Sequence, residues 1–295
     1  MKAYFKRKNI DISGYFFLIP AMGFFLTFVL YPMISGVYLS FFKTKGRGEI
    51  FVGFDNYLNL LTNKVFIKSM RNTAVITMVA VPIVILLALF ISIHIYNKSP
   101  NVRSFFRGVF YIPAISSVVS VTVVWLWIYN PDFGIMNYIL KNAGVIGTNV
   151  QWLGNAQTAI YAIIAVLITT SLGQPIILYV AALGNVPEEL MEAARIDGAN
   201  NWTVFSKIIW PSIRPTTLYI VVTTTINSFQ IFSLIQLMTA GGPNYATSTV
   251  MYLVYEQAII LQEYGSASAM GVILAIIIAF VSTLQFKALS EDVSY

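Results

Sequence analysis

Long apolar runs separated by short polar segments set the pattern of this chain. Runs of this length with few charges are typical of transmembrane helices, because a helix needs about 20 apolar residues to cross the hydrocarbon core of a bilayer. Transmembrane β-strands are shorter and alternate between apolar and polar residues, which excludes a β-barrel. The pattern predicts an all-α polytopic membrane protein, a single transmembrane domain over residues 1–295. Its six transmembrane helices are expected at about residues 14–39, 72–96, 109–129, 156–183, 215–238 and 264–286.

Prolines and short amphipathic segments modify this pattern. Pro32 predicts a kink in the first span, because proline removes a backbone hydrogen bond. Gly173 and Pro175 are two residues apart in the fourth span and predict a loosened backbone there. Short surface helices are expected after Asn56 and after Gly134, where apolar residues follow a helical spacing.

A charged segment, residues 186–211, separates the fourth and fifth apolar runs. Pro187 suits the first turn of a helix, and the carboxylates that follow it favour the positive end of the helix dipole. Gly198 is suited to the position just after the helix end. A second amphipathic segment begins near Trp202 and is expected to end at Pro211. The segment is therefore predicted to form two short helices joined by a glycine turn, exposed to water at a membrane surface.

Composition and charge support this interpretation and add an orientation. The chain is 57% hydrophobic and 10% charged, with a mean hydropathy of +0.74, values too apolar for a soluble domain. The net charge of +6 arises from residues spread over short loops, which form no stripe suited to nucleic acid. Eleven of the 18 Lys and Arg residues fall in segments predicted to be internal, although six lie in the first external loop. We expect both termini in the cytoplasm of a bacterial or archaeal cell.

The sequence lacks the common nucleotide-binding and catalytic motifs. The sequence has no Gly-x-x-x-x-Gly-Lys-Ser/Thr phosphate loop, no His-Glu-x-x-His helix and no Gly-x-Ser-x-Gly elbow. It also has no cysteine and a single histidine, His94, which excludes a multi-histidine or thiolate metal site. The glutamates near residue 190 suit capping and docking better than acid–base catalysis. We therefore expect no catalytic residue and no bound metal or cofactor.

Uncharged polar residues within the spans are candidates for a solute path. Thr224, Asn227 and Ser228 lie on one face of the fifth span, and Gln230 extends an overlapping stripe. Amides are costly in hydrocarbon, so this face must look into protein or a water-filled path. The polar residues bind either a hydroxyl-rich solute or a neighbouring helix. The fourth span adds Thr169, Gly173 and Gln174, with the same two interpretations.

The charged segment resembles the cytoplasmic coupling loop of ABC importer permeases. It has Glu-Ala-Ala, three further residues, Gly, and then Ile-x-x-Pro at Ile208 to Pro211. In that family the first helix of the loop docks into a cleft on a separate ATPase subunit. The resemblance implies that the coupling residues are Glu188, Glu189, Glu192, Ala193, Ala194, Asp197 and Gly198.

Further segments resemble the carbohydrate branch of these permeases, which includes maltose and glycerol-3-phosphate importers. The similarity covers nearly the whole chain and includes Phe54-Asp55-Asn56-Tyr57 and the Gly241-Gly242-Pro243 turn. It points to the first of two paired permeases, the one similar to the maltose-binding subunit, although the large periplasmic insertion of that subunit is absent. Carried over by position, its sugar contacts fall at Thr169, Leu172, Gly173, Ile176, Thr224, Asn227 and Ser228.

The resemblance implies an importer of several subunits. A second, similar permease, two ATPase subunits and an extracytoplasmic solute-binding protein are the expected partners, with ATP and Mg on the ATPase subunits. The expected solute is a carbohydrate, an oligosaccharide in particular. Two alternatives remain: a permease for another polar solute such as a glycerophosphodiester, and a carrier that works without an ATPase.

Overall fold

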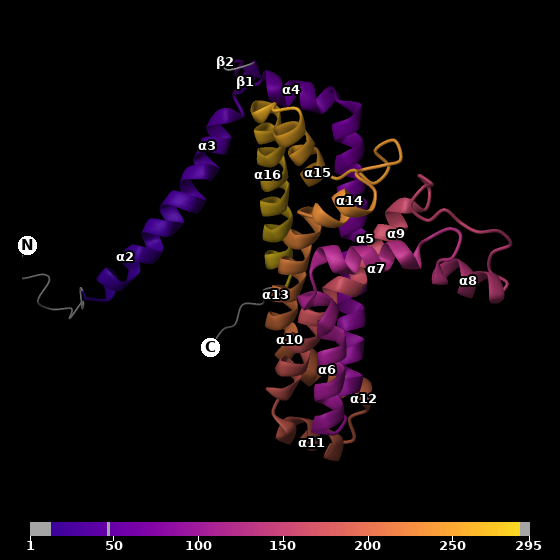
Figure 1. Ribbon diagram of the computed structural model, residues 1–295. Helices are drawn as coiled ribbons and strands as arrows, with labels where there is room; N and C mark the ends of the chain where they lie inside the picture. Colours follow the sequence, from indigo (N-terminus) through magenta and orange to yellow (C-terminus); the bar gives the residue numbers. More distant parts are fainter. Residues whose placement is uncertain (1–12, 46–47, 290–295) are drawn as a thin grey trace, which may run out of the picture.

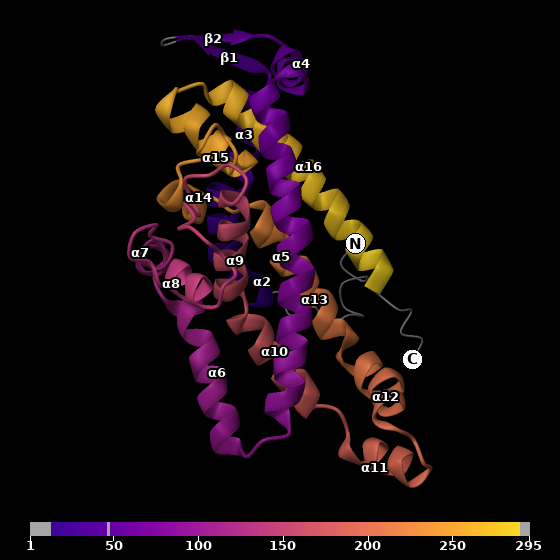
Figure 2. The same ribbon diagram turned by 90° about the vertical axis from the view of Figure 1, so that its right-hand side faces the viewer.

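The computed structural model describes residues 13–45 and 48–289, and helices dominate it (Figure 1). The longest helix, α5 (Lys64–Tyr96), runs through the length of the main body. It packs against α9, α10 and α13, helices that follow later in the chain. Figure 2 shows β1, β2 and α4 at one end of α5, with α11 and α12 near the other. The body therefore has two ends, joined by the same helix.

The first predicted span is a single rod that leans away from the body in Figure 1. It consists of α2 (Ser13–Phe25), a π-helical turn η1 (Leu26–Leu30) and α3 (Tyr31–Leu39). The π turn comes directly before the Tyr31-Pro32 pair, so the irregularity lies where a kink is expected. Of this rod, α3 contacts α16 (Tyr264–Leu289) in the body.

A hairpin and a short helix close the end of the body opposite α11 and α12, which we call the outer end. Strands β1 (Phe42–Lys45) and β2 (Gly48–Phe51) pair antiparallel, and the expected surface helix follows as α4 (Asp55–Thr62). The buried Asn56 amide donates to the Ser40 and Phe42 carbonyl oxygens, both at 2.8 Å. These bonds hold the start of the hairpin against α4. The sequence pattern predicted the helix but not the hairpin.

Helix α5 begins earlier than the predicted second span. The Asn63 side chain accepts hydrogen bonds from the backbone N–H groups of Val65 and Phe66, which caps the helix at this point. The cap lies nine residues before the first residue of the run at 72–96. Pro82 is inside the helix and does not end it.

The third predicted span is not one helix. Helices α6 (Pro100–Ile115) and α7 (Val118–Ile128) meet at an angle of 97°. Ser116 and Ser117 between them have extended backbones, with ψ of 148° and 134°, and Ser116 Oγ donates to the Ile112 carbonyl. Serine side chains compete for backbone groups in this way and favour helix ends. The prediction of a single helix over 109–129 is wrong for this reason. Helix α8 (Ile135–Asn142) is the surface helix expected after Gly134.

The fourth predicted span bends where the sequence suggested. Helices α9 (Ala159–Ser171) and α10 (Gly173–Gly184) meet at 41°. A Cβ on Gly173 would lie 2.7 Å from the Phe110 carbonyl oxygen, so α10 approaches the α6 backbone closely at this glycine. The expectation of a loosened backbone at Gly173 and Pro175 is confirmed.

The second half of the charged segment continues directly into the fifth predicted span. Helix α12 (Asn201–Val204), the π turn η2 (Phe205–Ile209) and α13 (Trp210–Phe229) follow one another without a break. The expectation that Pro211 ends the helix is wrong, because the wider π turn just before it accommodates a residue that lacks an N–H. The span itself ends early, since residues 230–232 separate α13 from α14 (Ser233–Met238).

The last part of the chain packs on the outer half of the body. It contains α15 (Val250–Tyr255), the π turn η3 (Glu256–Ile260) and α16, which contacts α13 and α15. A stripe of small residues runs along α16. Ala267, near its start, is 4% exposed, whereas Ala275 and Ala279 are exposed. Within this chain the stripe is thus a packing seam only near the outer end.

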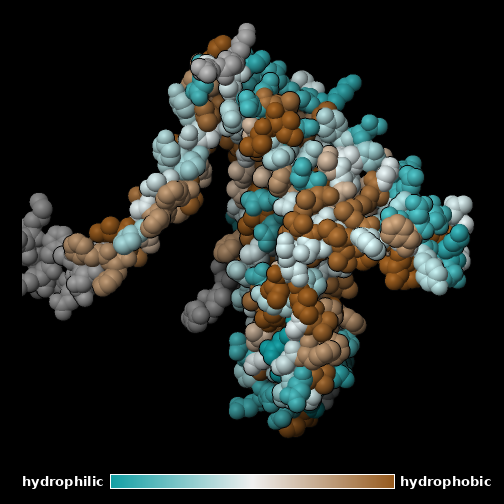
Figure 3. All heavy atoms as spheres, in the orientation of Figure 1, coloured by the Kyte–Doolittle hydropathy of each residue, from teal (hydrophilic) through white to brown (hydrophobic). Residues whose placement is uncertain are grey.

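Helix length and composition are consistent with a protein of several spans. Residues 16–39, α5 and α16 are each long and apolar enough to cross a membrane. The bent pairs α6–α7 and α9–α10 qualify when each pair is taken as one span. Helix α13 has 20 residues but is more polar, with five threonines. In Figure 3 brown apolar residues cover much of the N-terminal rod and of the middle of the body, and teal hydrophilic residues gather toward the two ends of the body.

Candidate coupling and substrate-path sites

The predicted coupling helix is α11 (Glu188–Ile196), and its end is fixed by the glycine that follows. Gly198 has φ of +83°, a conformation that residues with a side chain rarely adopt. Its N–H donates to the Arg195 carbonyl at 3.1 Å, and the Ala199 N–H donates to the Ala194 carbonyl at 2.9 Å. This pair of bonds is a Schellman motif. The expected role of Gly198 after the helix end is confirmed, and the motif sets the direction of the chain toward α12.

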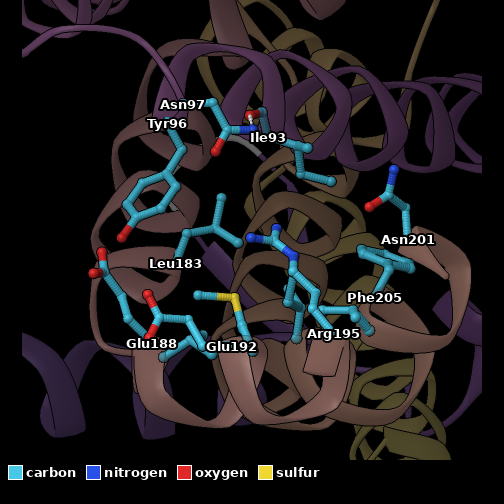
Figure 4. Close-up of a pocket in the computed structure, with 13 residues that line it drawn as sticks. Ile93, Tyr96, Asn97, Leu183, Glu188, Glu192, Arg195, Asn201 and Phe205 are labelled. Atoms are coloured by element: carbon cyan, nitrogen blue, oxygen red, sulfur yellow. Dashed lines mark hydrogen bonds between the residues drawn. The ribbon is translucent and has the colours of Figure 1, made fainter. Parts of the chain in front are cut away.

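Helix α11 has two different faces. Glu188, Met191, Glu192 and Arg195 line a cavity of about 670 Å³ between α11, α12, η2 and the inner ends of α5 and α10 (Figure 4). The opposite face is turned away from the protein. Glu192 lines this cavity and is also exposed, so the expectation that it presents its charge to a partner stays a prediction. The helix spacing of 3.6 residues per turn puts Glu188 and Glu192 on one face and Ala193 on another.

The cavity combines an apolar wall with charged groups. Figure 4 shows the Arg195 guanidinium pointing toward its middle, with Glu188 and Glu192 on the side of Tyr96. Leu183 is among the apolar residues of the wall. The side chains of Glu188, Glu192 and Arg195 make no ion pair or hydrogen bond with other described residues. Their charges are thus free to meet a partner that approaches from the rim.

The outward side of the two short helices is apolar as well as charged. Leu190 is 54% exposed, Ile196 86% and Trp202 72%, and Glu189, Ala193 and Asp197 are exposed near them. Large apolar side chains this exposed in a water-facing loop indicate a protein interface. We call the surface made by Glu189, Leu190, Ala193, Ile196, Asp197 and Trp202 the coupling face.

Polar residues of the fourth and fifth predicted spans meet at a smaller cavity of about 190 Å³ between α6, α9, α10 and α13. Of the predicted contact residues, Gln174, Thr224 and Asn227 line it. The remaining lining residues are Ala114, Thr170, Ser171, Pro175, Leu178, Ile220 and Thr223. Ser171 and the α6 residue Ala114 were not anticipated; the bend that follows Ser171 brings α6 to this point.

The other predicted contact residues lie outside this cavity. Leu172 and Ile176 are buried in an apolar cluster with α5 and α13, and Gly173 packs on α6. Ser228 is 2% exposed and is covered by this chain. Thr169 and Gln230 are exposed but do not line the cavity. Helical periodicity selected two helices that meet at this cavity, but it could not decide which face each bend would turn inward.

The smaller cavity offers hydroxyl and amide groups and no charge. Such groups both donate and accept hydrogen bonds, and Leu178 and Ile220 add apolar surface beside them. Its volume is below the roughly 300 Å³ of a typical small-molecule site, so it has the size of part of a site. Within residues 13–45 and 48–289, no group of three or more His, Cys, Asp or Glu residues could hold a metal ion.

Comparisons with known proteins identify the family of this chain. Residues 64–295 match the family model described as "Binding-protein-dependent transport system inner membrane component". The lactose transport system permease protein LacF of Rhizobium radiobacter is 29% identical over 97% of this chain and 96% of the relative. The multiple sugar-binding transport system permease protein MsmF of Streptococcus mutans is 32% identical over 93% and 94%, respectively.

A solved structure agrees over almost the full length. It is a chain of a bacterial ABC transporter involved in the import of the acidic polysaccharide alginate, with a TM-score of 0.79 and 26% identity. The match covers 97% of this chain and 96% of that chain. The fold is that of an ABC importer permease. The chain belongs to the family of binding-protein-dependent transport system inner membrane components and is a membrane-embedded transport subunit.

Proposed function

We propose that this chain is a permease subunit of an ATP-driven importer that moves a carbohydrate, in particular an oligosaccharide, across the cytoplasmic membrane. Permeases for lactose and for multiple sugars among its relatives support a carbohydrate. So does the uncharged, hydrogen-bonding cavity between α10 and α13, which suits a hydroxyl-rich solute. The single observation that carries the proposal is the coupling face, an exposed apolar surface on a short helix that ends in a fixed Schellman turn.

The coupling face docks on an ATPase subunit in this proposal. Two ATPase subunits bind ATP and Mg, and each contacts one of two permeases. Leu190 and Ile196 supply apolar contact area, while Glu189 and Asp197 offer charge to a basic rim. When the ATPases close, α11 moves with them and tilts the helices to which the α11 loop is joined. Both chain termini lie in the cytoplasm, on the side of α11.

The smaller cavity is half of a solute path. The exposed Gln174 and Asn227 face away from this chain's core, and a second, similar permease completes the site around the solute. An extracytoplasmic binding protein delivers the solute. A similar solved transporter was determined in complex with an alginate pentasaccharide-bound periplasmic protein, which supports such a partner.

Identification of the proteins that bind this chain tests the proposal. The tagged chain is isolated from its native membrane in mild detergent, the partners are identified by mass spectrometry, and ATPase activity is measured. We expect a second permease and an ATPase, with activity raised by the binding protein and a sugar. Recovery of the chain alone, without ATPase activity, would contradict the proposal and favour a carrier.

A second candidate solute is a glycerophosphodiester. The sn-glycerol-3-phosphate transport system permease protein UgpA of Agrobacterium fabrum is 27% identical over 96% of this chain and 97% of the relative. The cavity between α10 and α13 has no cationic residue to meet a phosphate, which favours a sugar. Stimulation of the complex by a glycerophosphodiester and by no sugar would reverse this choice.

A further inference from the structure

A cluster of basic residues lies beside the coupling loop, at the start of α6. No Asp or Glu occurs between Asp55 and Asp132, whereas Lys98, Arg103 and Arg107 cluster around the turn from α5 to α6. Here α6 and the end of α10 enclose a cavity of about 410 Å³, which we call the α6–α10 cavity. It is lined by Pro100, Arg103, Ser104, Arg107, Val180, Ala181, Gly184 and Asn185.

Arg103 is held in place by neutral groups. Its Nη2 donates to the Tyr96 carbonyl oxygen, and its guanidinium carbon lies 4.6 Å from the centre of the Tyr96 ring. Its Nε is buried and has no hydrogen-bond partner among the described residues. Carbonyl oxygens and an aromatic ring orient an arginine but do not neutralise it. The cavity therefore keeps a positioned positive charge.

Arg107 stands one helical turn further on the same face of α6. Its Nη2 donates to Ser104 Oγ at 3.1 Å, again a neutral group. The residues that line the α6–α10 cavity include no carboxylate. Two guanidinium groups thus share a site with hydroxyl and amide donors and no counter-ion from the described chain. Arginine is the side chain whose planar donor fork best matches a phosphate.

The surroundings place this site at a membrane surface. The opposite side of α6 exposes apolar side chains, with Phe105 67% and Val109 44% exposed, as expected for contact with lipid tails. The start of α6 lies at the same end of the body as α11 and α12 (Figure 2). Ala181 and Gly184 of α10 leave room between the helices. Basic pockets between helices on the cytoplasmic side are suited to acidic lipid head groups.

We propose that the α6–α10 cavity binds the phosphate of an anionic phospholipid from the cytoplasmic leaflet, with Arg103 and Arg107 as its ligands. Bound lipid stabilises the turn between α5 and α6, which is also next to the inner end of α10. This site is separate from the coupling face and from the cavity between α10 and α13, and the proposal does not depend on the identity of the solute.

Native mass spectrometry of the full chain, alone or with its partners, tests this site. The protein is taken from bilayers of phosphatidylcholine with phosphatidylglycerol or cardiolipin, and bound lipids are counted. We expect anionic lipid to be retained over phosphatidylcholine. In Arg107→Gln the apparent affinity for the anionic lipid should fall about fivefold, the effect of one arginine near a charged surface. In Ala181→Phe, which fills the cavity and leaves both arginines in place, it should also fall.

Arg71→Gln is the matched control, because Arg71 is exposed and lies at the opposite end of α5. It should retain anionic lipid like the unchanged protein. A thermal unfolding scan in lipid-free detergent checks that the variants are folded. Equal retention of anionic lipid in Arg107→Gln, Ala181→Phe and the unchanged protein would overturn the proposal. Displacement of the lipid by millimolar inorganic phosphate would also overturn it, since the site would then bind a free anion.

Discussion

Single residues decide how the outer end of this permease is assembled. Gly265, at the start of α16, touches the start of the hairpin: a Cβ at this position would lie 1.8 Å from the Phe42 carbonyl oxygen. The same carbonyl accepts from the Asn56 amide. One backbone oxygen thus fixes the hairpin, α4 and α16 relative to each other. Neither contact could be inferred from the sequence, because the spacing of apolar and polar residues does not show which backbone will lie against a glycine.

Replacing Gly265 with alanine should therefore destabilise the protein. The new methyl group cannot fit without shifting backbone, and such overpacking costs about 1–3 kcal/mol. Gly271→Ala on the same helix is the control, because a Cβ at Gly271 meets nothing within 4 Å. Thermal unfolding in detergent should show a lower midpoint for Gly265→Ala and an unchanged or slightly higher one for Gly271→Ala. Equal midpoints would show that α16 and the hairpin are not packed as described.

Asn227 allows a residue-level test of the solute path. Asn227 lines the cavity between α10 and α13, whereas its neighbour Ser228 is buried inside the chain. We expect Asn227→Ala to raise the solute concentration for half-maximal uptake about tenfold, because a hydrogen bond to the solute is lost. Ser228→Ala should leave this concentration unchanged. Uptake measured in cells or proteoliposomes distinguishes the two variants. A larger effect of Ser228→Ala than of Asn227→Ala would place the path on the other face of α13.

At the scale of elements, the apolar pattern predicted where helices occur, and local backbone chemistry decided where they bend. The Gly173–Pro175 bend was foreseeable, because glycine and proline both weaken a helix. The 97° break at Ser116 and Ser117 was not, because serines also occur inside apolar helices, where the hydroxyl donates to a carbonyl one turn earlier. The π turn before Pro211 also reversed an expectation. Such turns depend on packing, and a single sequence gives no direct sign of them.

The two faces of α11 lead to a prediction about docking. Ile196 is 86% exposed on the coupling face, and its replacement by aspartate should weaken capture of the ATPase subunit at least about tenfold, as for an apolar contact at the centre of an interface. Ile139→Asp is the control, because Ile139 is similarly apolar and 54% exposed but lies on α8. Pull-down of the ATPase with each variant measures the effect. Undiminished capture by Ile196→Asp would place the interface elsewhere on the loop.

At the scale of the whole molecule, the sequence was sufficient for the class of protein and for the helix and glycine turn of the charged segment. The helix with the Glu-Ala-Ala segment and the Gly198 turn depend mainly on residues that are near in sequence, so they can be predicted from the sequence. The solute path is assembled from helices that are distant in sequence, so only part of it could be predicted. The α6–α10 cavity was missed for the same reason: Arg107 and Ala181 are 74 positions apart in the sequence.

Helix α5 has a mechanical consequence. At 1.5 Å per residue its 33 residues extend for about 50 Å, well beyond the roughly 30 Å of the bilayer core. Helix α5 is therefore long enough to extend beyond the bilayer core. Its outer end abuts the α4 region, and its inner end forms part of the cavity behind α11. A tilt of a few degrees at the end near α11 would displace the end near α4 by several ångströms, so a movement that starts at α11 would reach the opposite end of the body without any helix unwinding.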